Sequence, residues 1–449
     1  MFKKNNIHFV GIGGSGMSGI AEVLINMGHN VSGSDIKKTD VTDYLKKIGA
    51  KVCIGHEAKN IRNAEVVVTS TAVSKDNPEV SAALKNKIPV IPRIEMLAEL
   101  ARLKYTISIA GTHGKTTTTS LTSLALGEGG LDPTIVIGGR LKNLNTGARL
   151  GRGEYLVAEA DESDGSFLKL SPAITVVTNI DDDHLDYYGN MQNLKEAFVK
   201  HINSIPFYGA AILCSDDKTV CQIIPRITRK YITYGLNANP DIKAENIKIN
   251  SSYTSYDVYY FGKKQGNVRI KIPGRHNITN SLAAVGVGLR LGIPFNLISR
   301  AINKFDGVGR RLEIKGEKNG VTVIDDYGHH PTEVAATLKA VKDFWPKRRL
   351  IVLFQPHRYS RTKQLFKEFG SSFSGADAVK VTDIYSAGER RIKGVSSELI
   401  LKSLKSNKCD ASKFEGARAL ASSLCGGEII LTLGAGDIWK QGEEILKLI

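Results

Sequence analysis

A glycine-rich segment that ends in a lysine and two threonines is the part of the sequence best suited to chemistry. The apolar run 105–110 leads into this segment, and a Ser/Thr-rich stretch with helical character follows it. Glycines let backbone N–H groups turn toward phosphate oxygens, and the start of a helix adds positive potential. The pattern predicts an ATP-binding loop formed by Gly111, Thr112, His113, Gly114, Lys115, Thr116 and Thr117.

Two side chains of this loop have expected roles. Lys115 would reach the β- and γ-phosphates, and the Thr116 hydroxyl would ligate Mg²⁺. The loop is shorter than G-x-x-x-x-G-K-[ST], because position 109 is isoleucine. A glycine turn that merely precedes a helix is the alternative, but the strand–loop–helix context favours phosphate binding.

A second glycine loop follows the first apolar run of the chain. It fits G-x-G-x-x-G and contains Gly11, Gly13, Gly14, Ser15 and Gly16. Such a loop suits a pyrophosphate at a helix start, and Asp35, at the end of the next strand, could bond a ribose or base. Taken alone, the loop fits NAD(P), another nucleotide or simple tight packing. Two phosphate loops in one chain suggest two phosphorylated ligands.

Acidic, histidine and arginine residues follow other predicted strands. Glu159 and His184 come after strands of the ATP-binding block, where they would hold Mg²⁺ or merely cap helices and contact water. Asn277 and Asn280 would share one face of a helix start, where they either read a base or cap the helix. Two clusters late in the chain contain Asp326, His329, Arg358 and Arg361. The two arginines, three apart, could clamp carboxylates or phosphates, and surface salt bridges are the alternative.

Composition restricts the classes of protein that the chain can belong to. The 449 residues suggest two to four domains, and the absence of a long uncharged apolar stretch argues against membrane insertion. The apolar run near the N-terminus is shorter than a secretory signal needs. Five scattered cysteines fit reduced cytoplasmic thiols. The net charge of +16 could suit nucleic acid, but no base-reading module or block of like charges accompanies it.

Strand, glycine loop and helix recur along the chain, which predicts parallel α/β domains. We expect a Rossmann-like N-terminal domain over residues 1–102, a central P-loop ATPase-type domain over 103–311 and a Rossmann-like C-terminal domain over 312–449. Alternating polar and apolar residues over 242–272 predict additional antiparallel hairpins.

Taken together, these motifs resemble the Mur ligase family of peptidoglycan synthesis. The resemblance spans nearly the whole chain and is carried by nine segments in the family's order: GIGGSGMSGIAE (11–22), GTHGKTTTT (111–119), EADESDGSFL (159–168), TNIDDDHLDYYG (178–189), GRHNITNSLAA (274–284), GRRLE (309–313), DDYGHHPTE (325–333), QPHRYSRT (355–362) and LGAGDIWK (433–440).

The resemblance implies an ATP- and Mg²⁺-dependent ligase. In the branch that these motifs match best, ATP phosphorylates the lactyl carboxylate of UDP-N-acetylmuramate, and L-alanine attacks the acyl phosphate. The glycine loop at Gly11 would then bind the UDP-sugar. The family pattern also implies metal contacts by Thr116, Glu159 and His184, adenine-side asparagines at 277 and 280, ATP contacts by Arg311 and Asp326, and amino-acid-side positions at His329, Arg358 and Arg361.

One departure from the wider family bears on the choice of branch. Sister ligases carry a carbamylated lysine where this chain has Phe198, and the alanine-adding branch lacks that lysine as well. This leaves open what completes the second magnesium shell. The basic segment 389–393 also has no explanation in the family pattern. We expect a cytoplasmic monomer or weak homodimer.

Three other interpretations stay open at this point. A ligase that attaches a preformed tripeptide to the same sugar nucleotide shares most of the motifs. A basic nucleic-acid-binding ATPase would show turnover stimulated by DNA or RNA and steep salt dependence. A dehydrogenase would use the first glycine loop for NAD(P) but leaves the ATP loop unexplained.

Overall fold

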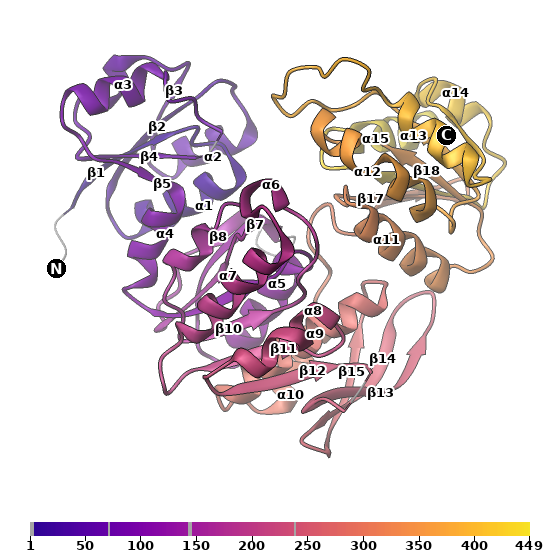
Figure 1. Ribbon diagram of the computed structural model, residues 1–449, viewed down its shortest axis with the longest axis horizontal. Coiled ribbons are helices and arrows are strands. Elements are labelled where there is room, and N and C mark those ends of the chain that lie inside the picture. The colour runs from indigo at the N-terminus through magenta and orange to yellow at the C-terminus, as the bar shows by residue number, and fades with distance from the viewer. Residues whose placement is uncertain (1–3, 71, 142–145, 238) are drawn as a thin grey trace. The chain divides into compact units, whose positions relative to one another are not determined.

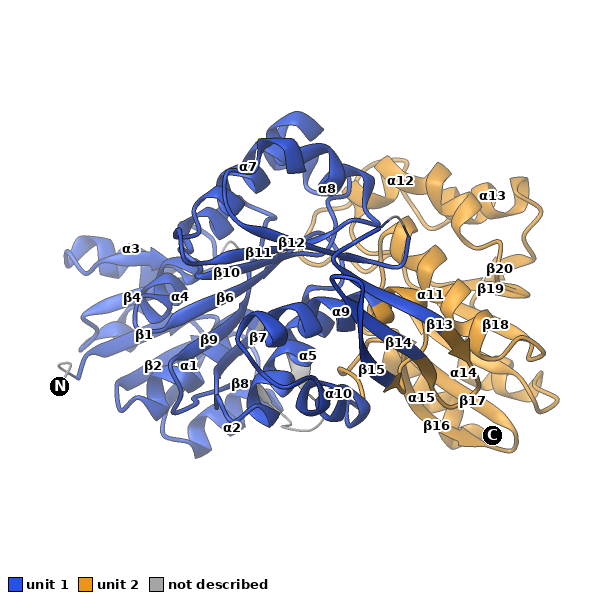
Figure 2. Cartoon of the chain, turned by 90° about the horizontal axis from the view of Figure 1, so that it is seen from below, with its two compact units in different colours: residues 1–246, 256–268, 279–305 blue, residues 247–255, 269–278, 306–449 orange. Residues whose placement is uncertain are grey.

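The computed structural model describes residues 4–70, 72–141, 146–237 and 239–449, with the side chains of Ser15, of residues 138–147 and of Asp186 outside this description. The chain divides into two compact units, shown in two colours in Figure 2. Unit 1 comprises residues 1–246, 256–268 and 279–305, and unit 2 comprises 247–255, 269–278 and 306–449.

Within the described residues, the first sheet is parallel and has the strand order β3-β2-β1-β4-β5 (Figure 1). Its central strand β1 is apolar, with Phe9 and Val10 fully buried, as expected for a parallel strand covered on both faces. The strands are β1 (Asn6–Val10), β2 (Asn30–Asp35), β3 (Lys51–Ile54), β4 (Val66–Thr69) and β5 (Val90–Pro92). The helices are α1 (Ser15–Asn26), α2 (Asp40–Lys47), η1 (Ala58–Ile61), α3 (Pro78–Lys85) and α4 (Arg93–Ala101).

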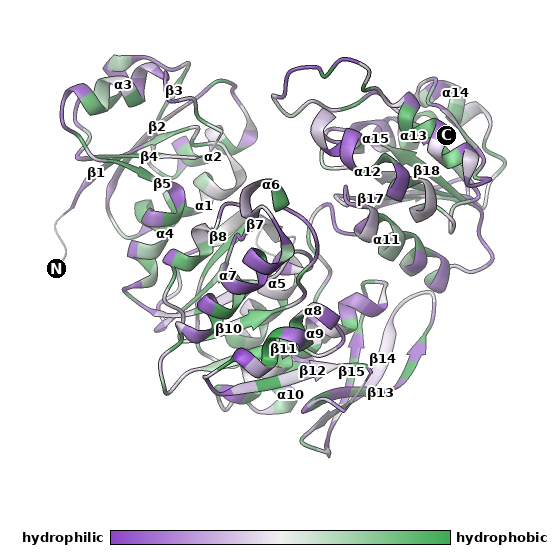
Figure 3. Cartoon of the chain, viewed as in Figure 1, coloured by the Kyte–Doolittle hydropathy of each residue, from purple (hydrophilic) through white to green (hydrophobic). Residues whose placement is uncertain are grey.

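The second sheet has the order β15-β14-β13-β12-β11-β10-β6-β9-β7-β8 in the described chain. Its middle strands are almost wholly apolar, as the hydropathy colouring of β10 and β11 shows in Figure 3. The strands are β6 (Tyr105–Ala110), β7 (Thr134–Leu141), β8 (Thr146–Arg149), β9 (Tyr155–Glu159), β10 (Ile174–Val177), β11 (Ala210–Cys214), β12 (Tyr231–Gly235), β13 (Ile242–Ile249), β14 (Thr254–Tyr260) and β15 (Lys263–Ile270). The helices are α5 (Lys115–Glu128), η2 (Ser166–Lys169), α6 (Leu185–Tyr188), α7 (Met191–Asn203), α8 (Lys218–Ile223), η3 (Ile224–Arg226), α9 (Arg275–Arg290) and α10 (Phe295–Asn303).

The third sheet belongs to unit 2 and has the order β16-β17-β21-β18-β19-β20 among the described strands. β16 pairs antiparallel with β17, and the other pairs are parallel. The strands are β16 (Glu313–Lys318), β17 (Val321–Asp326), β18 (Leu350–Phe354), β19 (Ala378–Val381), β20 (Ala411–Lys413) and β21 (Ile429–Leu433). The helices are α11 (Pro331–Phe344), α12 (Tyr359–Ser372), α13 (Glu398–Ser406), α14 (Ala417–Ser422) and α15 (Trp439–Leu448).

These elements confirm the predicted α/β class. Strands over 242–272 are present as β13 to β15, whereas α2 and α7 were not predicted. None of the described helices is both long and apolar enough to cross a membrane.

Candidate active site

Three neighbouring strands of the second sheet end where the predicted phosphate loop and the acidic run begin. β6 lies between β10 and β9, with Ala110 beside Val177 and Ile109 beside Glu159. Because these strands are parallel, the segments that follow them leave from the same edge of the sheet. The sheet order therefore brings together motifs that are far apart in the sequence.

The two glycines of the phosphate loop are required by its conformation. Gly111 has φ +128° and Gly114 has φ +83°, values that favour glycine. A Cβ atom at Gly111 would overlap the Thr178 hydroxyl, and one at Gly114 would lie 2.6 Å from Asn280 Oδ1. Helix α5 starts directly after Gly114, so its first N–H groups are available to phosphate oxygens.

The loop after β10 fixes the shape of the phosphate loop through side chains. Asn179 Oδ1 accepts from His113 N at 2.8 Å, while Asn179 Nδ2 and Thr178 Oγ1 donate to His113 O. Asp181 N donates to Thr112 Oγ1 at 3.0 Å, and Asp181 Oδ2 lies 3.1 Å from His113 Nε2. Thr112 and His113 are therefore positioned by the segment that leads to His184.

Lys115 is held by a carboxylate that sequence reasoning did not select. Its Nζ donates to Gly111 O at 2.6 Å and to both Glu162 oxygens at 2.9 and 2.8 Å. Burial lowers the pKa of Lys115, but Glu162, Asp161 and Glu159 raise it by more, so the net pKa is above the ordinary value. The lysine is a fixed positive charge at the start of α5.

The predicted magnesium residues lie around this lysine. Glu159 ends β9 and acts electrostatically on Lys115, and Thr116 is in the first turn of α5. His184 has φ +62° and places Nε2 4.0 Å from Glu162 Oε1 and 3.7 Å from Asp183 Oδ2. The left-handed backbone of a non-glycine residue at this position is typical of functional sites.

The chemistry of these groups fits a magnesium ion. Carboxylate and hydroxyl oxygens are the ligands that Mg²⁺ prefers. Glu162 is almost completely buried, and within the described chain it sits between Lys115 and His184. It is therefore an additional candidate ligand from the same acidic run, and the clustering of four carboxylates over 159–164 was the signal in the sequence.

The two asparagines occupy helix α9 but do not cap it, because α9 begins at Arg275. Asn280 Oδ1 accepts from Thr118 Oγ1 at 3.2 Å and lies against Gly114, so this side chain contacts the phosphate loop. Asn277 Nδ2 donates to Pro273 O at 2.6 Å. Neither asparagine therefore occupies the N-cap position of α9, and the adenine-side role stays a prediction.

The first glycine loop is stabilised by Asp35. Gly11 has φ +79°, and Gly13 N donates to Asp35 Oδ2 at 2.9 Å. A Cβ at Gly13 would also lie 2.9 Å from that oxygen. Asp35 thus shapes the loop, and its other oxygen, Oδ1, accepts from Lys37 N at 3.3 Å. Its ribose contact stays a prediction. Gly14 precedes α1, and the side chain of Ser15 lies outside the described residues.

His201 is fully buried beneath the strands that carry the site. Its Nε2 lies 3.1 Å from Ser108 Oγ on β6 and 3.1 Å from Thr175 Oγ1 on β10. Burial lowers the pKa of His201 from 6.5 to about 4. The imidazole is therefore neutral in the folded protein at neutral pH.

This histidine predicts a loss of stability in mild acid. Below pH 6.5 the unfolded chain gains a proton at His201, whereas the folded chain does not until about pH 4. The His201 contribution to the unfolding free energy should therefore fall by about 3 kcal/mol across this interval, at about 1.4 kcal/mol per pH unit. Chemical denaturation of wild type and His201→Gln at about pH 7 and about pH 5 measures it. The variant should show the shallower pH dependence, and equal slopes would contradict the assignment.

In unit 2, Asp326 is a buried anchor at the end of β17. Its Oδ2 accepts from Leu312 N and its Oδ1 from Gly328 N, both at 2.8 Å. Burial raises the pKa of Asp326 to about 6, and the nearby Arg311 opposes this rise. Arg311 lies 5.2 Å over the Tyr327 ring. Asp326 and Arg311 are thus near each other, and their ATP contacts stay predictions.

His357 lies beside two of the residues predicted on the amino-acid side, His329 and Arg361. It belongs to the motif at 355–362, but the sequence predicted no role for it. The His357 ring lies 5.4 Å from the His329 ring, and its Nδ1 lies 3.2 Å from Arg361 Nη1. Burial, and then nearby charges, lower the pKa of His357 to about 3. For His329, burial is opposed by Glu333, and the pKa falls to about 4. Arg358 has φ +68° and donates its backbone N–H to Tyr385 O at 2.8 Å.

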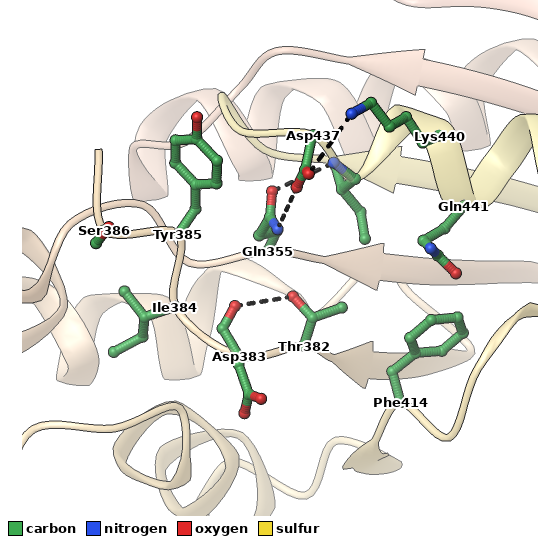
Figure 4. Close-up of a pocket in the computed structure, with 11 residues that line it drawn as sticks. Gln355, Thr382, Asp383, Ile384, Tyr385, Ser386, Phe414, Asp437, Lys440 and Gln441 are labelled. Carbon is green, nitrogen blue, oxygen red and sulfur yellow. Dashed lines mark hydrogen bonds and ion pairs between the residues drawn. The ribbon is translucent and has the colours of Figure 1, made fainter. Parts of the chain in front are cut away.

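An open pocket of about 490 Å³ lies at the carboxyl ends of β18, β19 and β21 (Figure 4). Gln355 crosses it and donates to Asp437 Oδ1 at 3.0 Å. Tyr385 and Lys440 also line the pocket. These residues come from the motifs at 355–362 and 433–440 and from the loop after β19, and the sequence predicted no role for any of them.

Comparison with known proteins identifies the family to which the chain belongs. Family models match residues 6–105 (Mur ligase family, catalytic domain), 109–288 (Mur ligase middle domain) and 310–436 (Mur ligase, glutamate ligase domain). The chain therefore belongs to the Mur ligase family, with its three-domain α/β architecture.

Within this family, the chain is similar to the following individual proteins. A UDP-N-acetylmuramate–L-alanine ligase of Endomicrobium trichonymphae is 73% identical, covering 100% of both chains. One of Trichlorobacter lovleyi is 54% identical over 98% of both. The crystal structure of UDP-N-acetylmuramate-alanine ligase from Thermotoga maritima is 30% identical, with a TM-score of 0.84 over 99% of this chain and 98% of that one. A murein peptide ligase of Psychrobacter arcticus, 22% identical with a TM-score of 0.73, shares the fold.

Proposed function

We propose that this protein is an ATP-dependent amide ligase that joins L-alanine to the lactyl carboxylate of UDP-N-acetylmuramate in peptidoglycan synthesis. The choice of substrates is supported by the 73% identity with a ligase of that name over the full chain. ATP as phosphoryl donor is supported by the cradle of Gly111, Gly114 and the fixed charge of Lys115.

The chemistry follows from the weakness of a carboxylate as an electrophile. Transfer of the γ-phosphoryl group to a lactyl oxygen turns that oxygen into a leaving group. The alanine amine then attacks the acyl carbon, the C–O bond to phosphate breaks, and an amide, ADP and phosphate result. Lys115 and the N–H groups at the start of α5 stabilise charge on the transferring phosphoryl group.

Thr116, Glu159 and His184 would hold Mg²⁺, with Glu162 as a further candidate. The ion would neutralise phosphate charge during transfer. We expect Glu159→Ala to raise the Mg²⁺ concentration needed for half-maximal turnover and to lower kcat by about 100-fold, because one anionic ligand is lost. Binding of UDP-N-acetylmuramate, measured calorimetrically without ATP, should stay within twofold. An equal loss of both would indicate a structural role for Glu159.

Product analysis tests the proposal directly. The protein is supplied with UDP-N-acetylmuramate, MgATP and a mixture of amino acids, and in parallel with the preformed tripeptide. We expect ADP release and an alanine adduct identified by mass spectrometry. Turnover with tripeptide but not with alanine would overturn the assignment in favour of the recycling ligase.

We also propose a division of labour along the chain. Residues 1–102 would bind the UDP-sugar, 103–311 would bind ATP, and 312–449 would contribute the amino-acid side through His329, Arg358 and Arg361. The protein would act in the cytoplasm, which is consistent with free cysteines at all five positions. It would act as a monomer or weak homodimer. Light scattering at several protein concentrations would determine the oligomeric state.

A further inference from the structure

An arginine outside all the recognised motifs lies on the first glycine loop. Arg93 begins α4, and its guanidinium occupies the place where a Cβ of Gly16 would be, in overlap with Nη1 and 2.9 Å from Cζ. Unlike Gly11, Gly16 does not have a left-handed φ. Glycine at position 16 therefore leaves room for the Arg93 guanidinium to lie directly against the loop.

The other end of the same guanidinium reaches the ATP-binding side of unit 1. Arg93 Nη2 donates to Asp161 Oδ2 at 3.1 Å. Asp161 lies between Glu159 and Glu162, and its Oδ1 accepts from Ser163 N at 3.1 Å. Arg93 thus bridges the loop expected to hold the sugar nucleotide and the acidic run around Lys115.

The ion pair between Arg93 and Asp161 can be replaced by contacts of Arg93 to a bound anion. The Arg93 and Asp161 side chains are 34% and 37% exposed, so their attraction is screened and contributes little net stability. A pyrophosphate carries more charge than one carboxylate and presents several oxygens to the planar fork of an arginine. An anionic ligand at the glycine loop would therefore compete well with Asp161 for Arg93.

We propose that Arg93 is a positioning residue for the sugar nucleotide: its guanidinium binds pyrophosphate oxygens at the Gly16 end of the first glycine loop, and Asp161 is its counterion until the substrate arrives. This inference rests on the proposed function. The exchange would link binding of the sugar nucleotide to the acidic run beside the ATP lysine, because Asp161 loses its counterion when the substrate takes Arg93.

Calorimetric titration of the full-length protein with UDP and with UDP-N-acetylmuramate tests the inference. Arg93→Ala should weaken both ligands by about 10- to 100-fold, as expected for the loss of a charge-assisted bidentate contact. Arg93→Lys, which keeps the charge but not the fork, should recover part of this loss. In steady-state assays of Arg93→Ala, KM for UDP-N-acetylmuramate should rise while KM for ATP stays within twofold.

The variant Asp161→Asn distinguishes two roles of the Arg93–Asp161 ion pair: replacement by the pyrophosphate, or a purely structural contact. Without the competing carboxylate, UDP should bind at least as tightly as in wild type, the opposite direction from Arg93→Ala. Lys169→Ala is the matched control, because Lys169 and Glu95 form a 3.6 Å ion pair between η2 and α4, the helix that Arg93 begins. It should bind both ligands normally, and thermal melting should show all variants folded.

Several outcomes would overturn the inference. They are unchanged affinity in Arg93→Ala, equal weakening in Arg93→Ala and Asp161→Asn, or weakening for UDP-N-acetylmuramate but not UDP, which would place Arg93 at the lactyl carboxylate. The proposed function fails separately: wild type would then bind UDP-N-acetylmuramate without forming an alanine product, or would not bind it at all.

Discussion

Lys115→Ala should lower turnover of UDP-N-acetylmuramate, alanine and MgATP by about 1000-fold or more while the chain still folds. The reason is that a fixed positive charge at the start of α5 is lost from the phosphoryl-transfer site. ADP release under saturating substrates measures the effect. Near-normal turnover would show that the loop does not hold the reacting phosphates.

A second variant also changes Glu162, the ion-pair partner of Lys115. Glu162 is 1% exposed and loses its ion pair in Lys115→Ala, so part of any destabilisation comes from an unpaired buried charge. The double variant Lys115→Ala/Glu162→Gln should regain thermal stability but not turnover. Lys195→Ala is the control, because Lys195 contacts only the exposed Gln222 in the described hydrogen bonds and should leave activity unchanged.

Gly111→Ala should weaken ATP binding strongly and lower the unfolding free energy by about 2 kcal/mol or more. Alanine at φ +128° is strained, and its Cβ would overlap Thr178 Oγ1 and lie 2.9 Å from Asn179 O. The displaced loop would misalign the phosphates, which predicts a fall in kcat/KM of about 100-fold or more. Titration with an ATP analogue and denaturant unfolding measure the two effects.

Gly127→Ala is the matched control in the same helix. Gly127 is exposed near the end of α5, and a Cβ added there would point into open space. Alanine at this position should raise the unfolding free energy by about 0.5–1 kcal/mol and leave turnover unchanged. If Gly111→Ala behaved like Gly127→Ala, the phosphate loop would be more adaptable than its contacts indicate.

Much of the fold was predictable because its signals are local. Mostly apolar runs that lead directly into a glycine mark parallel strands that are buried on both faces, as in β1 and β6. Helix starts were harder to place: α9 begins at Arg275, ahead of Asn277, which the sequence analysis placed at a helix start. The polar helix α2 was missed although Thr39 and Thr42 form a capping box at its start; of its apolar side chains only Leu45 is buried.

The candidate site was predictable as a set of motifs but not as a set of contacts. The acidic run offered Glu159, Asp161, Glu162 and Asp164, and nothing in their spacing says which one meets Lys115. The turn after β9 selects Glu162 by bringing it under the lysine. His357 likewise became important only when its ring was placed beside His329.

By itself, the sequence determined the family of the protein and its α/β class. The phosphate loop can be recognised from local sequence, because Gly111, Gly114 and Lys115 are close together in the chain. The family can be recognised from the order of the nine motifs, which is also a property of the sequence alone. Only the tertiary structure decided the partners of these groups. Arg93 meets Gly16 and Asp161 because α4 and the turn after β9 pack in one unit, and such long-range contacts leave no periodic trace in the sequence.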